Sequence, residues 1–166
     1  MAVKPDARIA ISVLYTQDQI TISLMADLWV ETWSKAMPGI DFSARRAWIL
    51  HRIGCSPCTL AAQTDQDRWL GFALLDPATG QLDQLAVATA AYGTGVATAL
   101  LNRVKTICRD TVSLDVNADN ARALHFYKRE GFVQQGLGVN EHSGLPTIAM
   151  RWTKTNAAAS GHTGAG

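Results

Sequence analysis

The sequence contains no uncharged apolar run of about 18 residues, the length that a membrane-spanning helix needs. Its first residues, MAVKPDARIA, lack the apolar core of a secretory signal peptide. An excess of one charge is also missing, because 15 basic and 14 acidic residues leave a net charge of +1. A chain with this balance exerts no strong attraction on nucleic acid or on a membrane surface. We therefore expect a cytoplasmic protein that binds neither.

Cysteine is scarce as well, with three residues in the chain. Cys55 and Cys58 have the C-x-x-C spacing of redox sites, but they fall between a predicted helix and a predicted strand rather than at a helix N-terminus. The sequence offers no second ligand pair with zinc spacing. We interpret the pair as structural or incidental, place Cys108 in the core, and expect no metal.

The length and composition predict one globular domain. A chain of 166 residues that is 48% hydrophobic and 17% charged can bury a sizeable core. We predict that this domain spans residues 1–154. Residues 155–166, TNAAASGHTGAG, are small and polar, and we expect them to form a disordered tail.

Hydrophobic periodicity predicts a mixture of strands and helices. A strand over residues 8–15 should precede a helix that Asp18 caps and that runs to Lys35, and Ser43 should cap a second helix ending near Ile53. An antiparallel meander of three strands is predicted at residues 59–64, 69–76 and 82–87. After it we predict a helix ending at Cys108, a strand over 111–116, a helix over 121–129, and strands over 132–137 and 147–152. This mixture indicates a layered α/β domain.

The most informative stretch joins the strand ending at Val87 to the helix that follows Gly95. Gly93 and Gly95 allow the backbone to approach a ligand closely because neither residue has a Cβ atom. The first amides of the following helix have no intrahelical partner. The loop therefore predicts an anion site, most naturally for a phosphate or pyrophosphate.

Three phosphate-binding motifs compete for this loop. A P-loop needs Gly-Lys-Ser/Thr after the glycines, which the sequence lacks. A dinucleotide GxGxxG motif fits the two glycines and nominally Asp115 as its acid, but Thr98 replaces the third glycine and too little chain follows for a doubly wound sheet. The acyl-CoA loop Arg/Gln-x-x-Gly-x-Gly/Ala fits Gly95 and Ala97, with Tyr92 in place of the Arg or Gln.

A second motif favours the acyl-CoA loop. The segment from Asn120 to Phe132, NARALHFYKREGF, resembles the Asn-x-x-Ala-x-x-x-Tyr-x-x-x-Gly-Phe signature of the GNAT N-acetyltransferase superfamily. The two motifs occur in the family's order, and the resemblance covers roughly residues 69–152. It implies an α/β, GNAT-like layered fold, with a mixed but mostly antiparallel central sheet of about seven strands flanked by about four helices. It also implies direct transfer of an acetyl group from acetyl-CoA to a primary amine in a ternary complex.

The resemblance assigns roles to individual residues. Tyr127 would protonate the leaving thiolate, at modest cost because a phenol has a pKa of about 10 and a thiol one of about 8.5. Its alternative role is to pack the helix against the sheet. Asn120 would bind the pantetheine arm, cap its helix, or do both. Lys128 and Arg129 are further phosphate partners or simply solvated charges. The remaining cofactor contacts are expected at Leu85, Ala86, Val87, Tyr92, Gly93, Thr94, Gly95, Val96 and Ala97.

The general base is less well defined by the sequence. Gln81 occupies a position where many relatives carry Glu, and an amide cannot deprotonate an ammonium. Asp83 shares the strand face of Gln81 by the period of two and is our candidate, acting directly or through water. A solvent-facing strand residue is the alternative, and Glu31 is held in reserve. His51, His125 and His142 have no recognisable catalytic partner.

The first two predicted helices carry Trp29, Trp33 and Trp48, and in this family they form one wall of the acceptor groove. Core packing is the default for such a stripe, whereas an exposed Trp would favour an apolar or aromatic amine. Arg45 and Arg46 could meet an acidic substrate. The acceptor is expected to be a small-molecule or peptide amine, and a homodimer is left open. The alternative function is a non-catalytic acyl-CoA-binding regulatory module, since a shared fold does not guarantee a shared activity.

Overall fold

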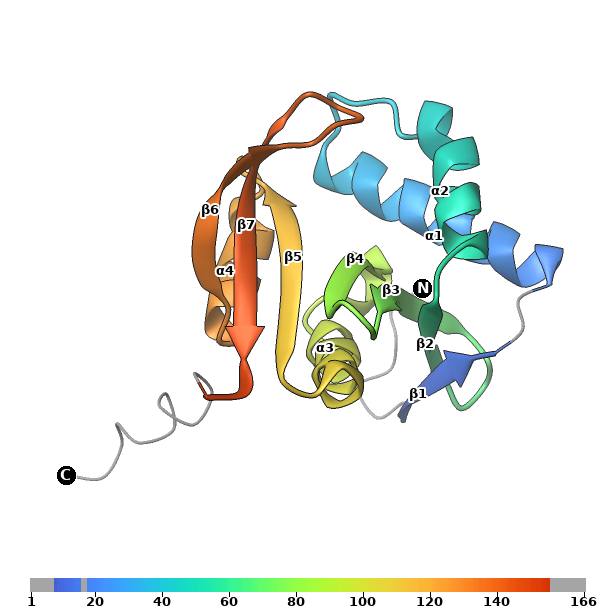
Figure 1. Ribbon diagram of the computed structural model, residues 1–166. Helices are drawn as coiled ribbons and strands as arrows, with labels where there is room; N and C mark the ends of the chain where they lie inside the picture. Colours follow the sequence, from blue (N-terminus) through green and yellow to red (C-terminus); the bar gives the residue numbers. More distant parts are fainter. Residues whose placement is uncertain (1–7, 16–17, 156–166) are drawn as a thin grey trace.

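The computed structural model describes residues 8–15 and 18–155. The first residues of the chain and residues 156–166 of the expected tail lie outside the described residues. A seven-stranded sheet has the order β1-β2-β3-β4-β5-β7-β6 (Figure 1). Its strands are β1 Ile9–Leu14, β2 Cys58–Thr64, β3 Trp69–Asp76, β4 Gln81–Val87, β5 Thr111–Asn117, β6 Val133–Val139 and β7 Pro146–Thr153. The α-helices are α1 Gln19–Ala36, α2 Arg46–Gly54, α3 Val96–Cys108 and α4 Ala121–Arg129, with short 3-10 turns η1 Ser43–Arg45 and η2 Thr89–Ala91.

Two helix starts test the capping predictions. The Asp18 carboxylate accepts a hydrogen bond from the Thr21 amide at 2.8 Å, which confirms Asp18 as the cap of α1. The prediction that Ser43 caps the second helix is wrong, because Ser43 begins the 3-10 turn η1 instead. The Asp41 carboxylate accepts from the Ser43 amide at 2.9 Å, so the acidic residue two positions earlier holds this turn.

The helices cover opposite faces of the sheet. Helices α1 and α2 pack over Phe72, Leu74 and Ala86 on one face. Helices α3 and α4 pack on the other face, against a larger core formed by the alternate residues of the same strands and by β5 and β7. Period-two alternation along buried strands produces these two cores. Together they confirm the predicted layered α/β fold.

The sheet opens between β4 and β5. These neighbours are parallel and share one register pair, Gln81 with Ser113, at the start of β4. All the other neighbouring strands pair antiparallel over six or seven register positions. Beyond the single pair, β4 and β5 diverge, as the gap between their ribbons in Figure 1 shows. The backbone edges of both strands are therefore left free of each other towards residues 87 and 117.

A bulge interrupts β4 at Asp83. Leu74 of β3 pairs with Gln84, whereas the next residue, Leu75, pairs with Leu82, so Asp83 has no partner across the ladder. A bulge of this kind turns two consecutive side chains towards the same face. Asp83 contacts α2 and Gln84 contacts α1, so both lie on the face that the two N-terminal helices cover.

Candidate active site

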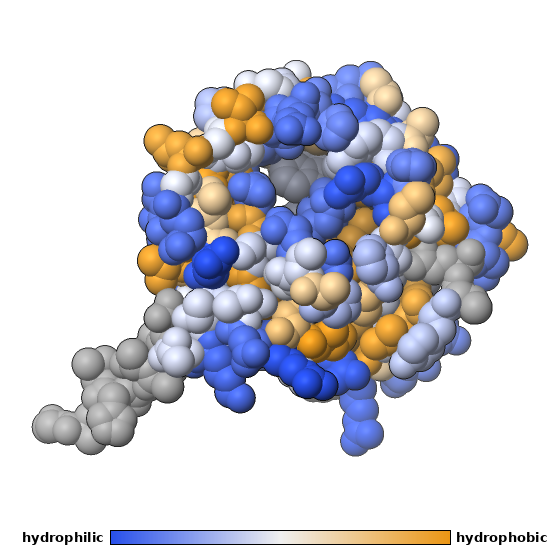
Figure 2. Space-filling view, viewed as in Figure 1, coloured by the Kyte–Doolittle hydropathy of each residue, from blue (hydrophilic) through white to orange (hydrophobic). Residues whose placement is uncertain are grey.

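A cleft with a volume of about 1090 Å³ lies where β4 and β5 diverge. One wall comes from α1 and the η1–α2 segment, and the other from α4 and the loop between β6 and β7. The loop before α3 closes one end. Figure 2 shows a recess at this position, between the β6–β7 side of the molecule and the α1–α2 side. The cleft brings together most of the residues that the two sequence motifs singled out.

The loop before α3 has the geometry of an anion site. Gly93 and Gly95 have φ angles of 77° and 85°, which glycine adopts without strain. The space beside both α-carbons is open, with no atom within 4 Å of an added Cβ. The Ala99 amide donates to the Gly95 carbonyl at 2.9 Å, so the amides of residues 96–98 precede the first helical bond and point out of the helix end. Gly93, Gly95 and residues 96–98 line the cleft, and the hydroxyl of Thr94 bonds the Ala91 carbonyl instead.

Tyr92 stands at the position where the motif has Arg or Gln, and a cation lies on its ring. The Arg122 guanidinium of α4 lies 3.7 Å from the centre of the Tyr92 ring, and both side chains line the cleft. Arg122 is therefore placed beside the loop that precedes α3. The sequence reasoning missed this residue, although it lies inside the Asn120–Phe132 motif. The only signal in the sequence is a basic residue at the second position of the helix that follows β5. That it meets Tyr92 depends on how the fold places this helix.

The free edge of β4 faces the cleft at Leu85 and Val87. The Ala88 amide bonds the Leu70 carbonyl at 2.8 Å, and an added Cβ at Gly71 would come within 2.6 Å of the Ala86 oxygen, so Ala86 faces β3. Because backbone groups alternate along a strand, Leu85 and Val87 direct theirs away from β3. The Val87 carbonyl already accepts from the Thr32 hydroxyl at 3.1 Å. Ala86 itself packs in the core under α1.

Tyr127 lies in the cleft wall with 9% of its surface exposed. Its ring packs edge-on against Phe126 and Phe132, with centroids 5.2 and 5.3 Å away. Burial raises the pKa of the phenol above its ordinary value, so the hydroxyl stays protonated at neutral pH. No described residue forms a hydrogen bond with that hydroxyl. Tyr127 is thus a neutral proton donor that lines the cleft, and its hydroxyl has no partner among the described residues.

The start of α4 contributes Asn120. Its side-chain oxygen accepts from the Ala123 amide at 3.1 Å, which shows the capping role. Asn120 also lines the cleft, and capping occupies the oxygen rather than the amide nitrogen. Arg129 lines the cleft as well, whereas Lys128 of the same helix does not.

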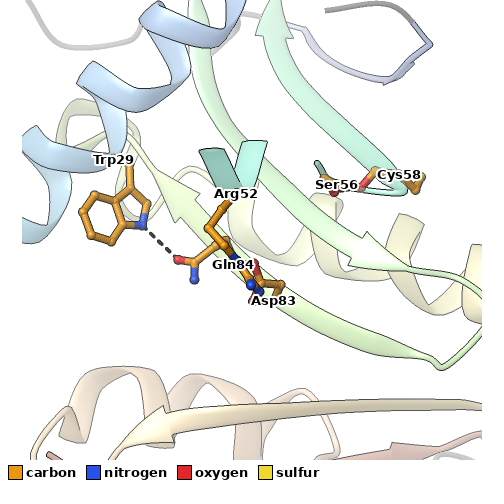
Figure 3. Close-up of polar contacts among 6 residues, drawn as sticks. All are labelled: Trp29, Arg52, Ser56, Cys58, Asp83 and Gln84. Carbon is orange, nitrogen blue, oxygen red and sulfur yellow. Dashed lines mark hydrogen bonds and ion pairs between the residues drawn. The ribbon is translucent and has the colours of Figure 1, made fainter. Parts of the chain in front are cut away.

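Asp83, the predicted base, reaches the cleft as one partner of an ion pair (Figure 3). Arg52 of α2 donates to both of its oxygens, from Nε to Oδ2 at 3.0 Å and from Nη2 to Oδ1. The neighbouring Gln84 accepts from the Trp29 indole at 2.9 Å. The reserve candidate Glu31 lies outside the cleft lining and pairs with Lys35 at 2.5 Å.

Asp115 is a second carboxylate in the cleft, which sequence reasoning considered only as a ribose ligand. It lies on β5 between Leu114 and Val116, which are buried on the α3–α4 side. Alternation therefore directs Asp115 to the same side of the sheet as Asp83. Its carboxylate is exposed, and it has no ion pair or hydrogen bond within residues 8–15 and 18–155. Asp115 is thus an unpaired acid that faces the cleft.

The wall that α1 and the η1–α2 segment form is lined by aromatic rings, which we call the aromatic wall: Trp29, Trp33, Phe42 and Trp48. Successive ring centroids lie 5.5 to 6.1 Å apart. The prediction that the three tryptophans pack in the core holds for Trp29, which is 4% exposed. Trp33 and Trp48 are half-buried and leave part of their rings in the cleft. His142 in the β6–β7 loop packs edge-on to Trp48 at 5.4 Å, and His125 also lines the cleft.

The remaining cysteine and metal predictions concern other parts of the molecule. Cys55 follows the last residue of α2 and Cys58 begins β2, both outside the cleft, and all three cysteines are free thiols. Among the residues that the structure describes, no group of three His, Cys, Asp or Glu side chains could hold a metal ion. None of the described helices is both long and apolar enough to cross a membrane.

Comparison with known proteins identifies the family and the fold. The model of the acetyltransferase (GNAT) family matches residues 21–132. The comparison with curated proteins gives no match. Among solved structures, apo YjaB from Escherichia coli superimposes with a TM-score of 0.74 at 19% identity, over 87% of this chain and 97% of that one. A Vibrio cholerae spermidine N-acetyltransferase SpeG chimera gives a TM-score of 0.61 at 18% identity, over 91% and 98%.

The Escherichia coli ribosomal-protein-alanine N-acetyltransferase gives a TM-score of 0.62 at 17% identity, over 88% of this chain and 94% of that one. At these identities the structural likeness establishes the fold, and the family match establishes the class of enzyme. The expected GNAT-like fold and the expected acetyltransferase class are confirmed. Because the family model covers more than half of its length, this chain belongs to the GNAT family and is an acetyltransferase.

Proposed function

We propose that the protein transfers the acetyl group of acetyl-CoA to a primary amine, by direct attack in a ternary complex. The observation that carries the proposal is the single cleft that joins an anion site, a free strand edge and a separate apolar wall. Two substrates can meet in such a cleft, one on the anion site and the strand edge and the other on the apolar wall. Holding both reactants in one site replaces a bimolecular step by an effectively intramolecular one.

The residues at the phosphate end fit a CoA pyrophosphate. The outward amides of residues 96–98 and the open space beside Gly93 and Gly95 supply a cradle for an anion. Arg122 and Arg129 add positive charge beside it. Bound there, acetyl-CoA would supply the activated acetyl group.

The backbone of Leu85, the backbone amide of Val87 and the side-chain nitrogen of Asn120 are proposed to hold the pantetheine arm. A strand amide at this edge can also donate to the carbonyl oxygen as negative charge develops on it. The Tyr127 hydroxyl is proposed to donate its proton to the sulfur that leaves. Burial raises the pKa of the Tyr127 phenol, which by itself makes Tyr127 a weaker proton donor. Burial would raise the pKa of the CoA thiol at the same place for the same reason, so the thiolate would also be a stronger proton acceptor.

Two carboxylates are proposed for removal of the amine proton. Asp83, the candidate from the sequence, would act through a water molecule, because Arg52 occupies both of its oxygens. Asp115 would act directly, since its carboxylate faces the cleft without a cationic partner in the described chain. A general base in reach of the amine contributes about 10²–10⁴ to the rate.

Ligand binding and turnover together test the proposal. Acetyl-CoA at about 100 times its Kd should stabilise the fold by about 2.7 kcal/mol, and NAD should not. A screen of amines, amino acids, polyamines and peptides should then find acceptors that release free CoA thiol. Stabilisation by NAD alone would contradict the acyl-CoA site. Stabilisation by acetyl-CoA with no turnover of any amine would favour the regulatory module.

The single domain over residues 1–154, the cytoplasmic location and the oligomeric state stay predictions. Sedimentation measures self-association. The strand at which a second copy could pair is β6. It is an edge strand that exposes Val133, Leu137 and Val139. Exposed strand edges can pair with another chain unless they are protected.

A further inference from the structure

The aromatic wall is apolar, with Trp33 and Trp48 half-buried and Trp29 and Phe42 buried behind them. The rings of Trp33 and Phe42 stack at 27° with centroids 5.8 Å apart, and Trp48 flanks Trp29 at 5.7 Å. The Trp29 indole N–H is taken by Gln84, so the floor of this wall offers no free donor. Covering the half-exposed Trp33 and Trp48 rings with an apolar or aromatic group removes apolar surface from water and is therefore favourable.

One cation stands at this wall without a carboxylate partner. Lys35 pairs with Glu31, Arg46 with Asp27, and Arg52 with Asp83. The Arg45 guanidinium lies over the Phe42 ring at 5.4 Å and lines the cleft. Within the described part of the chain, no acidic side chain pairs with Arg45. Its charge is therefore available to a ligand that lies on the wall.

We propose that the acceptor is an aromatic amine that also carries a carboxylate, an inference that rests on the proposed acetyl transfer. The aromatic body would lie on the wall, and its carboxylate would pair with Arg45, whose planar fork matches a carboxylate. The amine would point along the cleft towards Asp115 on β5. Recognition would thus use one apolar surface and one charge of each sign.

A polycationic acceptor fits this cleft poorly. Among the residues that line it, the acids are Asp83 and Asp115, and Asp83 is already paired with Arg52. A polyamine would place several ammonium groups in a cleft that leaves one carboxylate unpaired and also presents Arg45. Like charges brought together without compensation weaken binding.

Turnover of three acceptors tests the inference. Phenylalanine has the aromatic body, the amine and the carboxylate; phenethylamine lacks only the carboxylate; spermidine is the polycation. We expect kcat/KM for phenylalanine to exceed that for phenethylamine by about tenfold or more, as for one charge-assisted hydrogen-bonded pair. In Arg45→Gln this ratio should fall towards one. The neighbouring Arg46→Gln, whose guanidinium pairs with Asp27 outside the cleft, should keep the ratio.

A second readout does not depend on catalysis. Binding of 3-phenylpropionate, which has the aromatic body and the carboxylate but no amine, should quench tryptophan fluorescence in the native protein and in Arg46→Gln, and about tenfold more weakly in Arg45→Gln. Equal binding to the native protein and Arg45→Gln, or a preference for phenethylamine or spermidine in turnover, would overturn the inference. Arg45-dependent binding of 3-phenylpropionate without turnover of any amine would support the ligand class and contradict the proposed transfer instead.

Discussion

The Arg122 guanidinium lies 3.7 Å from the centre of the Tyr92 ring, although the two residues are 30 positions apart and belong to different motifs. A cation over an aromatic face at this distance is attracted by the ring's quadrupole, by about 0.5–1 kcal/mol at an exposed site. The tyrosine that departs from the acyl-CoA motif therefore holds a positive charge beside the phosphate loop. Arg122 can supply there the charge that the motif usually carries at position 92.

Arg122→Gln should weaken CoA binding by about fivefold, because an exposed charge pair with a phosphate contributes about 1 kcal/mol. Titration calorimetry measures the change, and it should shrink at high salt because screening weakens exposed charge pairs. Tyr92→Leu should lose a similar amount by releasing the guanidinium, and the double variant should lose little more. Lys128→Gln is the matched control, since Lys128 is on the same helix but outside the cleft lining. Equal losses in Arg122→Gln and Lys128→Gln would mean that the effect is one of net charge.

Gly95→Glu should abolish CoA binding, because its carboxylate would occupy the anion site and repel the pyrophosphate. The φ angle of 85° adds about 1–2 kcal/mol of backbone strain for any residue with a side chain. Gly95→Ala carries the same strain without the charge and is therefore the control. We expect both variants to lose similar stability in thermal unfolding, and Gly95→Glu alone to lose binding in calorimetry. Binding that survives in Gly95→Glu would place the phosphates elsewhere.

Tyr127→Phe should lower turnover by about 10²–10⁴ while leaving acetyl-CoA affinity nearly unchanged. The variant keeps the edge-on contacts of the ring with Phe126 and Phe132 and removes only the proton donor. Since no described residue bonds the hydroxyl, unfolding at neutral pH should be little affected. Steady-state kinetics and thermal unfolding separate the outcomes: full activity would show that the thiolate leaves without help from Tyr127, and a large loss of stability would show a structural role.

Asp115→Asn and Asp83→Asn should differ. We expect Asp115→Asn to lose about 10² or more in kcat/KM at neutral pH and to lose the acidic limb of its pH–rate profile, as removal of a general base does. Asp83→Asn breaks a half-exposed ion pair, which costs at most about 1 kcal/mol of stability. Arg52→Gln breaks the same pair from the other side. If Asp83→Asn alone loses the acidic limb while Arg52→Gln retains it, Asp83 is the base and the role proposed for Asp115 is wrong.

The cysteines should react in an order set by burial. Cys55 is exposed, whereas burial raises the pKa of the Cys58 and Cys108 thiols and so leaves them with less thiolate at a given pH. The thiolate is the reactive form, and limiting iodoacetamide near pH 8 should therefore label Cys55 first. Labelling of Cys58 should rise as the pH increases towards its raised pKa. Mass spectrometry measures the order, and a Cys55–Cys58 disulfide formed ahead of alkylation would contradict the structural interpretation of the pair.

The sequence alone determined the elements and the class of chemistry. Apolar periodicity placed the strands and the α-helices of the described chain, because period two and period 3.6 follow from local backbone geometry, but it missed the 3-10 turns η1 and η2. The glycine pair at 93 and 95 and the Asn120–Phe132 motif indicated the part of the cleft proposed for the cofactor, because a glycine loop before a helix and a helix cap are made by neighbouring residues. Asp18 was found as a cap for the same reason.

Only the tertiary structure decided the parts of the site that distant segments share. The bulge at Asp83 sets Asp83 and Gln84 on one face, which strict period two cannot predict. The pairing of Asp83 with Arg52, and of Tyr92 with Arg122, depends on how helices dock on the sheet. The sequence could not predict which aromatic residues line the cleft, because that depends on where β4 and β5 diverge. Local sequence fixes local hydrogen bonds, whereas the packing of elements far apart in the chain determines which side chains meet across a cleft.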